Sequence, residues 1–193
     1  MPMATRRFVL LVAIALVLGA CSAPAAPSFD PAGACTTDGS APGAYPELEA
    51  YVPATYRDAP PDHLDSGRNC SGSSLGTLAK LGFGEVRFAG GTWTFGAERA
   101  VVLAVFSAPG LDAGAMADFY AESARAASRT EILAESPSTI AGRPARRLDT
   151  KTGERLQTVI AWPSAVPDIV NVVVTNDLPE ARISDAIAAF GGR

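Results

Sequence analysis

The sequence predicts an α+β domain in which a mostly antiparallel sheet is flanked by helices, following an N-terminal signal peptide and a disordered linker. Short connections join neighbouring apolar strand segments, which predicts antiparallel pairing. Two other segments carry apolar side chains at helical spacing, which predicts amphipathic helices packed on the sheet. The 193 residues fit one domain with short extras. We divide the chain into a signal peptide (1–20), a lipidated cysteine with a flexible linker (21–46) and a single domain (47–193).

The N-terminal segment has the form of a secretory signal. Arg6 and Arg7 precede an uninterrupted apolar run over residues 8–18, and small residues follow. This run is too short to cross about 30 Å of hydrocarbon as a stable helix. The segment therefore predicts export and not a permanent membrane span.

The end of this segment, Leu18-Gly19-Ala20-Cys21, resembles the bacterial lipobox. The resemblance implies diacylglyceryl transfer to the Cys21 thiol, cleavage before Cys21, and a lipid-anchored protein on the extracytoplasmic face. Two or three acyl chains such as palmitate make the anchoring stable. Ser22 follows in place of an inner-membrane retention Asp, so the outer membrane is an alternative in a two-membrane cell. The competing interpretation is an ordinary signal peptide cut near residues 23–26.

Two cysteines remain after Cys21. Residues 22–46 are dominated by Ala, Pro, Gly and Ser, which is typical of a flexible linker. Cys35 lies in this linker and Cys70 in the following loop. An even pair in an exported chain predicts a disulfide, which would stabilise the fold by roughly 3–4 kcal/mol. Two free thiols or a metal site are the alternatives, although only one histidine, His63, is present to help bind a metal.

The first half of the domain gives mixed signals. Residues 46–52 indicate a short helical turn before Pro53, and residues 54–72 read as loop because of their Pro and Gly content. Ser73 or Ser74 can cap a short helix, whose apolar residues are Leu75, Leu78 and Leu81. The segments 85–88 and 92–95 alternate around Gly90-Gly91, as a tight hairpin or as one strand with a glycine bulge. Residues 100–107 predict a central strand.

The second half is more regular. Asp112 is a good N-cap for a helix whose Met116, Phe119 and Tyr120 form a core-facing stripe. Strands are expected over residues 130–134, 143–150, 154–162 and 168–175. Asp177 and Glu180 have capping-box spacing, and the last helix presents Ile183, Ile187 and Phe190 to the core.

Charge and motifs exclude several functions. Without the first twenty residues the chain has 14 basic against 20 acidic residues, a charge of about −6, so it lacks the basic surface that nucleic-acid binding needs. Gly82-Phe83-Gly84 lacks the third glycine of a dinucleotide fingerprint, and no cofactor or metal motif is present. A basic cluster is predicted to be a solvated strand face or, alternatively, an anionic-ligand patch; its members are Arg143, Arg146, Arg147 and Arg155.

Four short motifs carry a resemblance over most of residues 46–193. They are Leu48-Glu49-Ala50-Tyr51-Val52-Pro53, Leu78-Ala79-Lys80-Leu81-Gly82, Val105-Phe106-Ser107-Ala108-Pro109-Gly110-Leu111-Asp112 and Ile140-Ala141-Gly142-Arg143. The domain resembles uncharacterised bacterial lipoproteins of the Chloroflexi type, which carry no assigned activity, so no catalytic residue is carried over. The order of its elements is similar to the PsbP-like fold, a binding and assembly fold.

The first functional hypothesis is a non-catalytic, membrane-anchored domain that binds a small ligand or protein, or assists envelope assembly. Its expected partners are membrane lipid through Cys21 and one unknown ligand or protein. A purely structural envelope lipoprotein is the first alternative, and a pocket with several convergent polar groups would argue against it. A hydrolase using His63 with a nearby acid is the second alternative, and an exposed His63 far from any Ser, Cys or acid in a cleft would argue against it.

Overall fold

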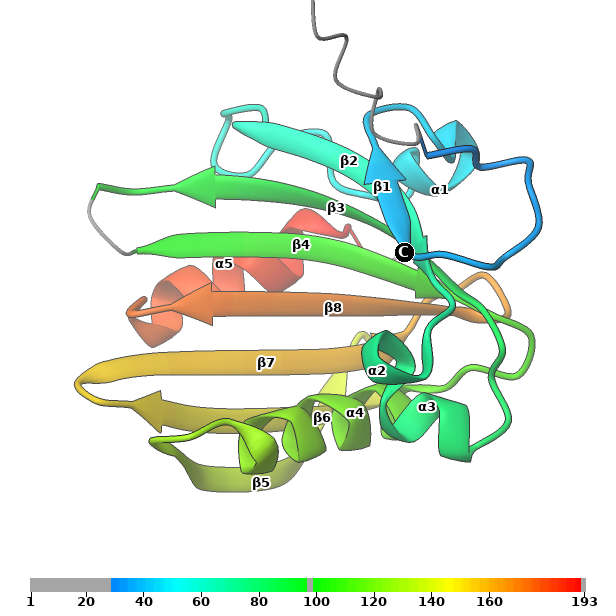
Figure 1. Ribbon diagram of the computed structural model, residues 1–193. Coiled ribbons are helices and arrows are strands. Elements are labelled where there is room, and N and C mark those ends of the chain that lie inside the picture. Colours follow the sequence, from blue (N-terminus) through cyan, green and yellow to red (C-terminus); the bar gives the residue numbers. More distant parts are fainter. Residues whose placement is uncertain (1–28, 97–98, 192–193) are drawn as a thin grey trace, which may run out of the picture.

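A computed structural model describes residues 29–96 and 99–191. The predicted signal peptide, Cys21 and the first part of the predicted linker lie outside these residues. The described chain forms one eight-stranded antiparallel sheet in the order β1-β2-β3-β4-β8-β7-β6-β5 (Figure 1). The prediction of a mostly antiparallel α+β sheet is confirmed.

The strands and helices have the following bounds. The strands are β1 (Gly39–Ala41), β2 (His63–Asn69), β3 (Val86–Thr94), β4 (Ala100–Ser107), β5 (Thr130–Ile140), β6 (Arg143–Thr152), β7 (Arg155–Pro163) and β8 (Ile169–Asn176). The helices are α1 (Pro46–Glu49), α2 (Gly72–Leu75), α3 (Thr77–Lys80), α4 (Ala113–Ala126) and α5 (Glu180–Ala189).

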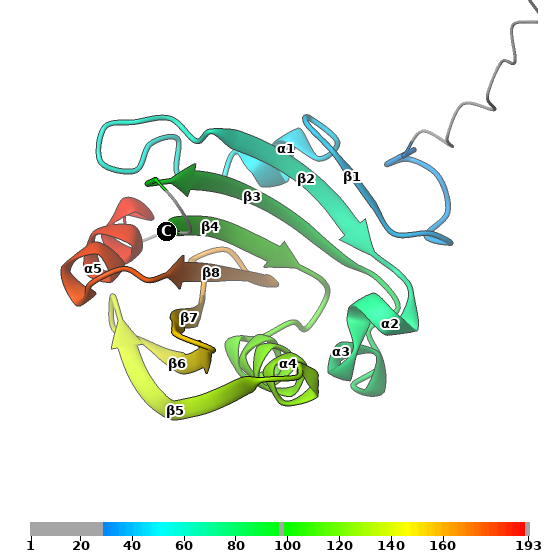
Figure 2. The ribbon, with the colours of Figure 1, turned by 60° about the vertical axis from the view of Figure 1, so that its left-hand side comes forward.

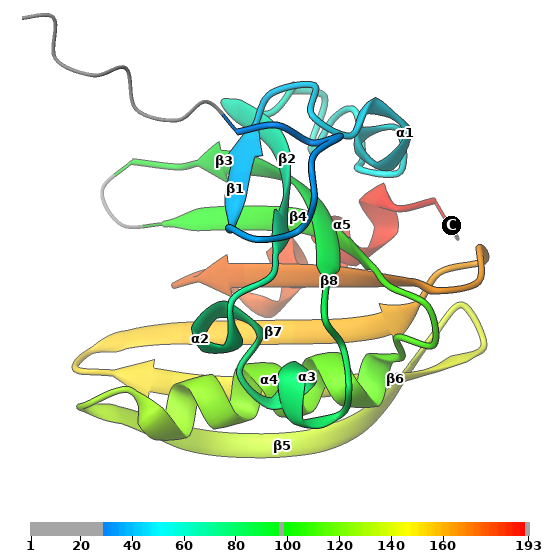
Figure 3. The same ribbon diagram turned by 45° about the vertical axis from the view of Figure 1, so that its right-hand side comes forward.

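Helices lie on both faces of the sheet. Helix α4, with the short α2 and α3, lies on one face, and α1 and α5 lie on the other (Figures 2 and 3). Each face has its own apolar core: Trp162, Phe190 and Leu103 belong to the α5 side, and Met116 and Leu148 belong to the α4 side. Because both faces are covered, β8 is an almost continuous apolar run, as the sequence indicated.

Helix α4 forms where the sequence predicts it. The Asp112 carboxylate accepts a hydrogen bond from the Ala115 backbone N–H at 2.8 Å, which satisfies one of the free amides at the helix start. Met116 is fully buried against the sheet. Helix α5 is also where it was expected, but Pro179 occupies its N-cap and the expected capping box is absent. Asp177 instead accepts a hydrogen bond from the Leu156 N–H.

Three local predictions change in the structure. Residues 54–72, expected to be loop, contain β2, which pairs along its length with β3. The helix expected after residue 73 is capped by Ser71, and it divides into α2 and α3 at Gly76, whose φ is +52°. Leu81, expected in the buried stripe, is 60% exposed. These differences arise because pairing and packing partners lie far away in the sequence.

The glycine pair lies inside one strand. Gly90 pairs with Ala104 and Gly91 with Leu103, in a register that continues without a shift from Arg87 to Thr94. Of the two alternatives, the hairpin is therefore excluded, and the single strand forms without the expected bulge.

The folded domain begins before the predicted boundary at residue 47. Strand β1 lies within the predicted linker and pairs with β2. The buried Arg68 donates hydrogen bonds to the carbonyl oxygens of Asp30, Gly33 and Ala34 at 2.7–3.1 Å. The Cys35–Cys70 disulfide, with a Cα–Cα distance of 5.7 Å, joins the same segment to the end of β2. The predicted disulfide is thus present, and residues 29–46 are held on the sheet and are not a free linker.

Candidate functional site

A cavity of about 410 Å³ lies between the C-terminal half of α4 and the sheet. Helix α4 lies across β6 and β7 at this point (Figure 1). The helix contributes Tyr120, Ser123, Ala124 and Ala127, and the strands contribute Thr130, Leu148, Thr150, Thr152, Arg155, Leu156, Gln157, Val159 and Asn176. Its volume is within the range of sites that bind small organic ligands.

The register of three strands builds the floor of this α4 cavity. Thr150 of β6 pairs with Gln157 of β7, which pairs with Asn176 of β8. These three polar residues therefore form one row across the sheet. Because side chains alternate between the two faces of a strand, a second row on the same face lies two residues away along each strand. That second row is apolar and consists of Leu148, Val159 and Val174.

The polar row carries both donors and acceptors. The Gln157 Nε2 donates to Asn176 Oδ1 at 3.1 Å, which aligns the two amides. The other polar groups of the row are Gln157 Oε1, Asn176 Nδ2 and the Thr150 hydroxyl. Thr130 and Thr152 hydroxyls bond each other at 2.7 Å at the rim. Polar groups of this kind are available to a ligand.

Tyr120 forms one wall of the α4 cavity. Its ring makes edge contacts with Phe106 and Phe119, at centroid distances of 6.4 and 5.4 Å. Burial raises the pKa of the Tyr120 phenol above its usual range, so the hydroxyl stays protonated at neutral pH. It can therefore donate or accept a hydrogen bond. The sequence placed Tyr120 in the core stripe of α4, and this residue does pack there while also facing the cavity.

His63 lies at an exposed position beside one carboxylate. Its side chain is 63% exposed at the start of β2, and its Nε2 lies 3.7 Å from the Asp65 carboxylate. No described serine or cysteine hydrogen-bonds to it, and it is absent from the walls of the α4 cavity. The described residues thus show an exposed pair of His63 with an acid, without a serine or cysteine bonded to it.

The four arginines of the predicted basic cluster are not gathered on one surface. Arg147 faces α5 and forms ion pairs with Glu180 and Asp149 at 2.8 and 2.9 Å, which raise the pKa of its guanidinium. Arg146, its neighbour in β6, is exposed and points to the opposite face. Arg143 and Arg155 lie at opposite ends of the β6–β7 hairpin, because Arg155 pairs with Thr152. A single anionic-ligand patch made of these four residues is therefore excluded.

Comparison with known proteins does not identify a family for this chain. No family matches the chain, and no curated protein is significantly similar to it. The site must therefore be interpreted from its own chemistry. Within the described residues, no three metal-ligating side chains cluster, and no helix is long and apolar enough to cross a membrane.

Sequence reasoning missed the residues of the α4 cavity. Thr150, Gln157 and Asn176 are polar positions near strand ends, each two residues from an apolar residue on the same face, and this was the only signal available. The sequence cannot indicate that the three lie side by side, because that depends on the pairing of β6, β7 and β8.

Proposed function

We propose that this chain is a lipid-anchored, extracytoplasmic binding protein that takes a small ligand into the α4 cavity. The observation that supports the proposal is the row of Thr150, Gln157 and Asn176, whose hydrogen-bonding groups converge beside an apolar row in a cavity of ligand size. A purely structural lipoprotein has no need of such a row, since filling the space with apolar side chains would give a better-packed core.

The chemistry of the cavity favours an uncharged, amphipathic ligand. No carboxylate is present among its lining residues, and its polar groups are hydroxyls and amides apart from Arg155. The neutral Tyr120 hydroxyl and the amides can both donate and accept, which suits ligand hydroxyl or amide groups. Leu148 and Val159 suit the apolar part of the same molecule. We therefore expect a small neutral compound with a polar end and an apolar end.

The anchor would hold this site close to a membrane. Phe29 packs edge-on against Tyr45 at a centroid distance of 6.3 Å, and the Arg68 guanidinium lies 5.5 Å from the Phe29 ring. Cys21 precedes Phe29 by eight residues, and eight residues extend over at most about 28 Å. A lipid on Cys21 would therefore keep the domain beside the membrane surface, where a binding protein meets envelope-derived molecules.

A ligand-retention experiment tests the proposal. The full chain in nonionic detergent is incubated with small molecules extracted from envelopes, separated by gel filtration, denatured, and analysed by mass spectrometry for retained compounds. Ala124→Phe fills the cavity from α4, whereas Ala126→Phe adds the same ring to the exposed side of this helix. We expect the wild type and Ala126→Phe to retain the same compound and Ala124→Phe to lose it.

A second variant separates loss of binding from loss of folding. Gln157→Leu removes the central amide of the polar row while keeping a side chain of similar size. We expect Gln157→Leu to unfold at a temperature close to that of the wild type and to retain much less ligand. If the wild type retains nothing, or if all variants retain the compound equally, the binding function in this cavity is wrong and the structural alternative is favoured.

A further inference from the structure

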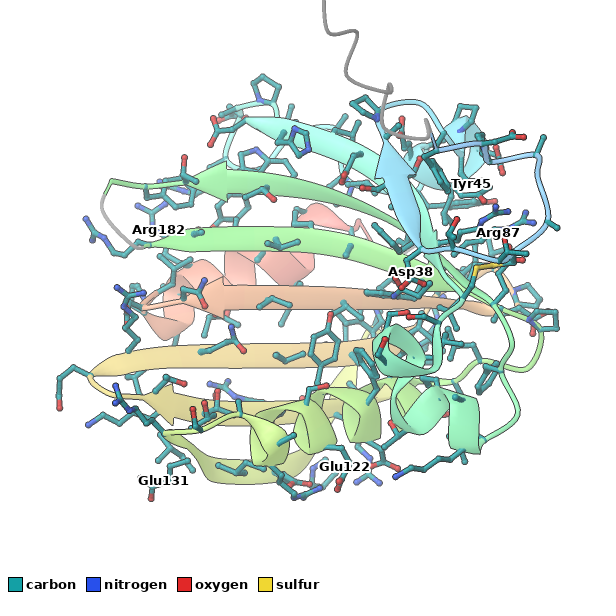
Figure 4. All side chains as sticks on the ribbon, in the orientation of Figure 1. Asp38, Tyr45, Arg87, Glu122, Glu131 and Arg182 are labelled. Carbon is teal, nitrogen blue, oxygen red and sulfur yellow. A yellow bond between two sulfur atoms is a disulfide. The ribbon has the colours of Figure 1, made fainter. Side chains whose placement is uncertain are left out.

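A second cavity, of about 250 Å³, lies where Phe95 after β3 and Arg99 before β4 meet the start of α5. Its lining residues are Phe95, Arg99, Leu178, Pro179 and Arg182. We call it the arginine cavity. It shares none of its lining residues with the α4 cavity. Figure 4 shows Arg182 at this end of the molecule, near the start of β4.

The arginine cavity has an apolar wall that rests on buried aromatic residues. The Phe95 ring contacts the buried Tyr56 edge-on at 5.8 Å, and Tyr56 in turn contacts Trp93 at 6.0 Å. The Tyr56 hydroxyl donates a hydrogen bond of 3.0 Å to the Arg182 carbonyl oxygen. One buried tyrosine therefore fixes both the aromatic wall and the backbone that carries Arg182.

The carboxylates close to Arg182 in the sequence have other partners. Glu180 pairs with Arg147 at 2.8 Å, and Asp185 pairs with Arg57 at 3.6 Å. Asp177 accepts a hydrogen bond from a backbone N–H. Within residues 29–96 and 99–191, the guanidinium groups of Arg99 and Arg182 have no ion-pair or hydrogen-bond partner. Among the described residues, two cations without an acidic partner therefore line one small cavity, in a protein whose charge without the first twenty residues is about −6.

We propose that the arginine cavity binds a small organic anion, with its carboxylate or phosphate group between Arg99 and Arg182 and its apolar part against Phe95, Leu178 and Pro179. Like charges on one cavity repel each other, and an anion between them removes this repulsion. Guanidinium groups recognise carboxylate and phosphate through paired N–H donors. The apolar wall adds selectivity for an anion that carries a ring or short chain, over inorganic phosphate. This site goes beyond the proposed function and does not depend on it.

Calorimetric titration of the full chain in nonionic detergent tests the site with three defined probes. Phenyl phosphate and benzoate carry the two anionic groups on the same ring, and benzyl alcohol is their neutral counterpart. We expect at least one of the two anions to bind and benzyl alcohol not to bind. The anion that binds more tightly shows whether the cavity prefers a phosphate or a carboxylate group. A further titration with dihexanoyl phosphatidate shows whether a lipid headgroup is preferred to a free phosphate ester.

Variants locate the binding. Arg99→Gln and Arg182→Gln are each expected to weaken the binding of the preferred anion by about tenfold, the usual effect of losing one charged hydrogen bond. Arg146→Gln is the matched control, since it removes the same charge from an exposed β6 position outside this cavity. The proposal would be overturned if neither anion bound, or if benzyl alcohol bound as tightly as the anions. It would also be overturned if Arg146→Gln weakened anion binding as much as the two cavity variants. A failure of ligand retention in the α4 cavity would leave these results unchanged.

Discussion

The Asp38 carboxylate accepts hydrogen bonds from both the backbone N–H and the hydroxyl of Ser71, at 2.9 and 2.6 Å. It also accepts hydrogen bonds from the Cys70 N–H at 2.6 Å and from the Ser74 hydroxyl at 2.9 Å. This one side chain therefore joins the segment before β1 to the start of α2. It does so beside the Cys35–Cys70 disulfide, so a covalent link and a polar link hold the same point (Figure 4).

We expect Asp38→Asn to lower the free energy of unfolding by about 1 kcal/mol, because a neutral amide accepts weaker hydrogen bonds than a carboxylate. The hydrogen bonds from Cys70 and Ser71 hold the pKa of Asp38 well below its usual range. Its stabilising effect is therefore full above the unfolded pKa of about 3.9 and is lost as the pH falls through the lower folded-state pKa.

Urea denaturation across a pH series checks this prediction. The wild type should lose more stability on acidification below pH ~4 than Asp38→Asn does, because only the wild type has this carboxylate to protonate. Asp118→Asn, on the exposed side of α4, serves as a charge-matched control that should follow the wild type. Parallel pH curves for the wild type and Asp38→Asn would contradict the role given to Asp38.

The disulfide gives a second prediction. The double variant Cys35→Ser, Cys70→Ser should lose roughly 3–4 kcal/mol of stability, because the bond closes a loop with a sequence separation of 35. Intact mass should rise by two hydrogens on reduction of the wild type and stay constant in the variant. A variant as stable as the wild type would mean that Arg68 and Asp38 alone hold this segment.

Gly67 gives a third prediction, at the edge of the sheet. A Cβ at Gly67 would lie 2.3 Å from the Gly39 carbonyl oxygen, so Gly67→Ala should push β1 away from β2 at a cost of about 1–3 kcal/mol. Gly84→Ala is the control, since no heavy atom lies within 4 Å of its Cβ position. Hydrogen exchange should be faster in residues 39–41 of Gly67→Ala only. Equal exchange in the two variants would show that the edge tolerates a side chain.

Cys21 gives a fourth prediction. If Cys21 carries the lipid, Cys21→Ala should abolish incorporation of an alkyne-labelled palmitate and move the protein from the membrane to the soluble fraction. Ser22→Ala is the adjacent control and should keep both properties. The mass of the mature N-terminus distinguishes the two signal types, because an ordinary signal peptide would be cut near residues 23–26 without lipid. Palmitate labelling of Cys21→Ala would rule out this anchor.

The sequence alone determined the elements whose signals are local. The Asp112 cap and the apolar stripe that contains Met116 gave α4, and the β-branched runs gave β4 and β8. Helix periodicity and strand alternation depend on residues a few positions apart, so they can be read directly from the chain. The Cys35–Cys70 disulfide was also predicted from the sequence, from the expectation that Cys21 is lipidated, and the structure contains this bond.

Only the tertiary structure showed the features that depend on contacts between residues far apart in the sequence. Strand β2 carries polar and glycine residues that resemble a loop, and it is a strand because β3 pairs with its whole length. The polar floor of the α4 cavity exists because the registers of two strand pairs bring Thr150, Gln157 and Asn176 into one row. The arginine cavity likewise joins Arg99 to Arg182 across more than eighty residues. Neither site has a local sequence signal, since both are created by strand register and helix packing.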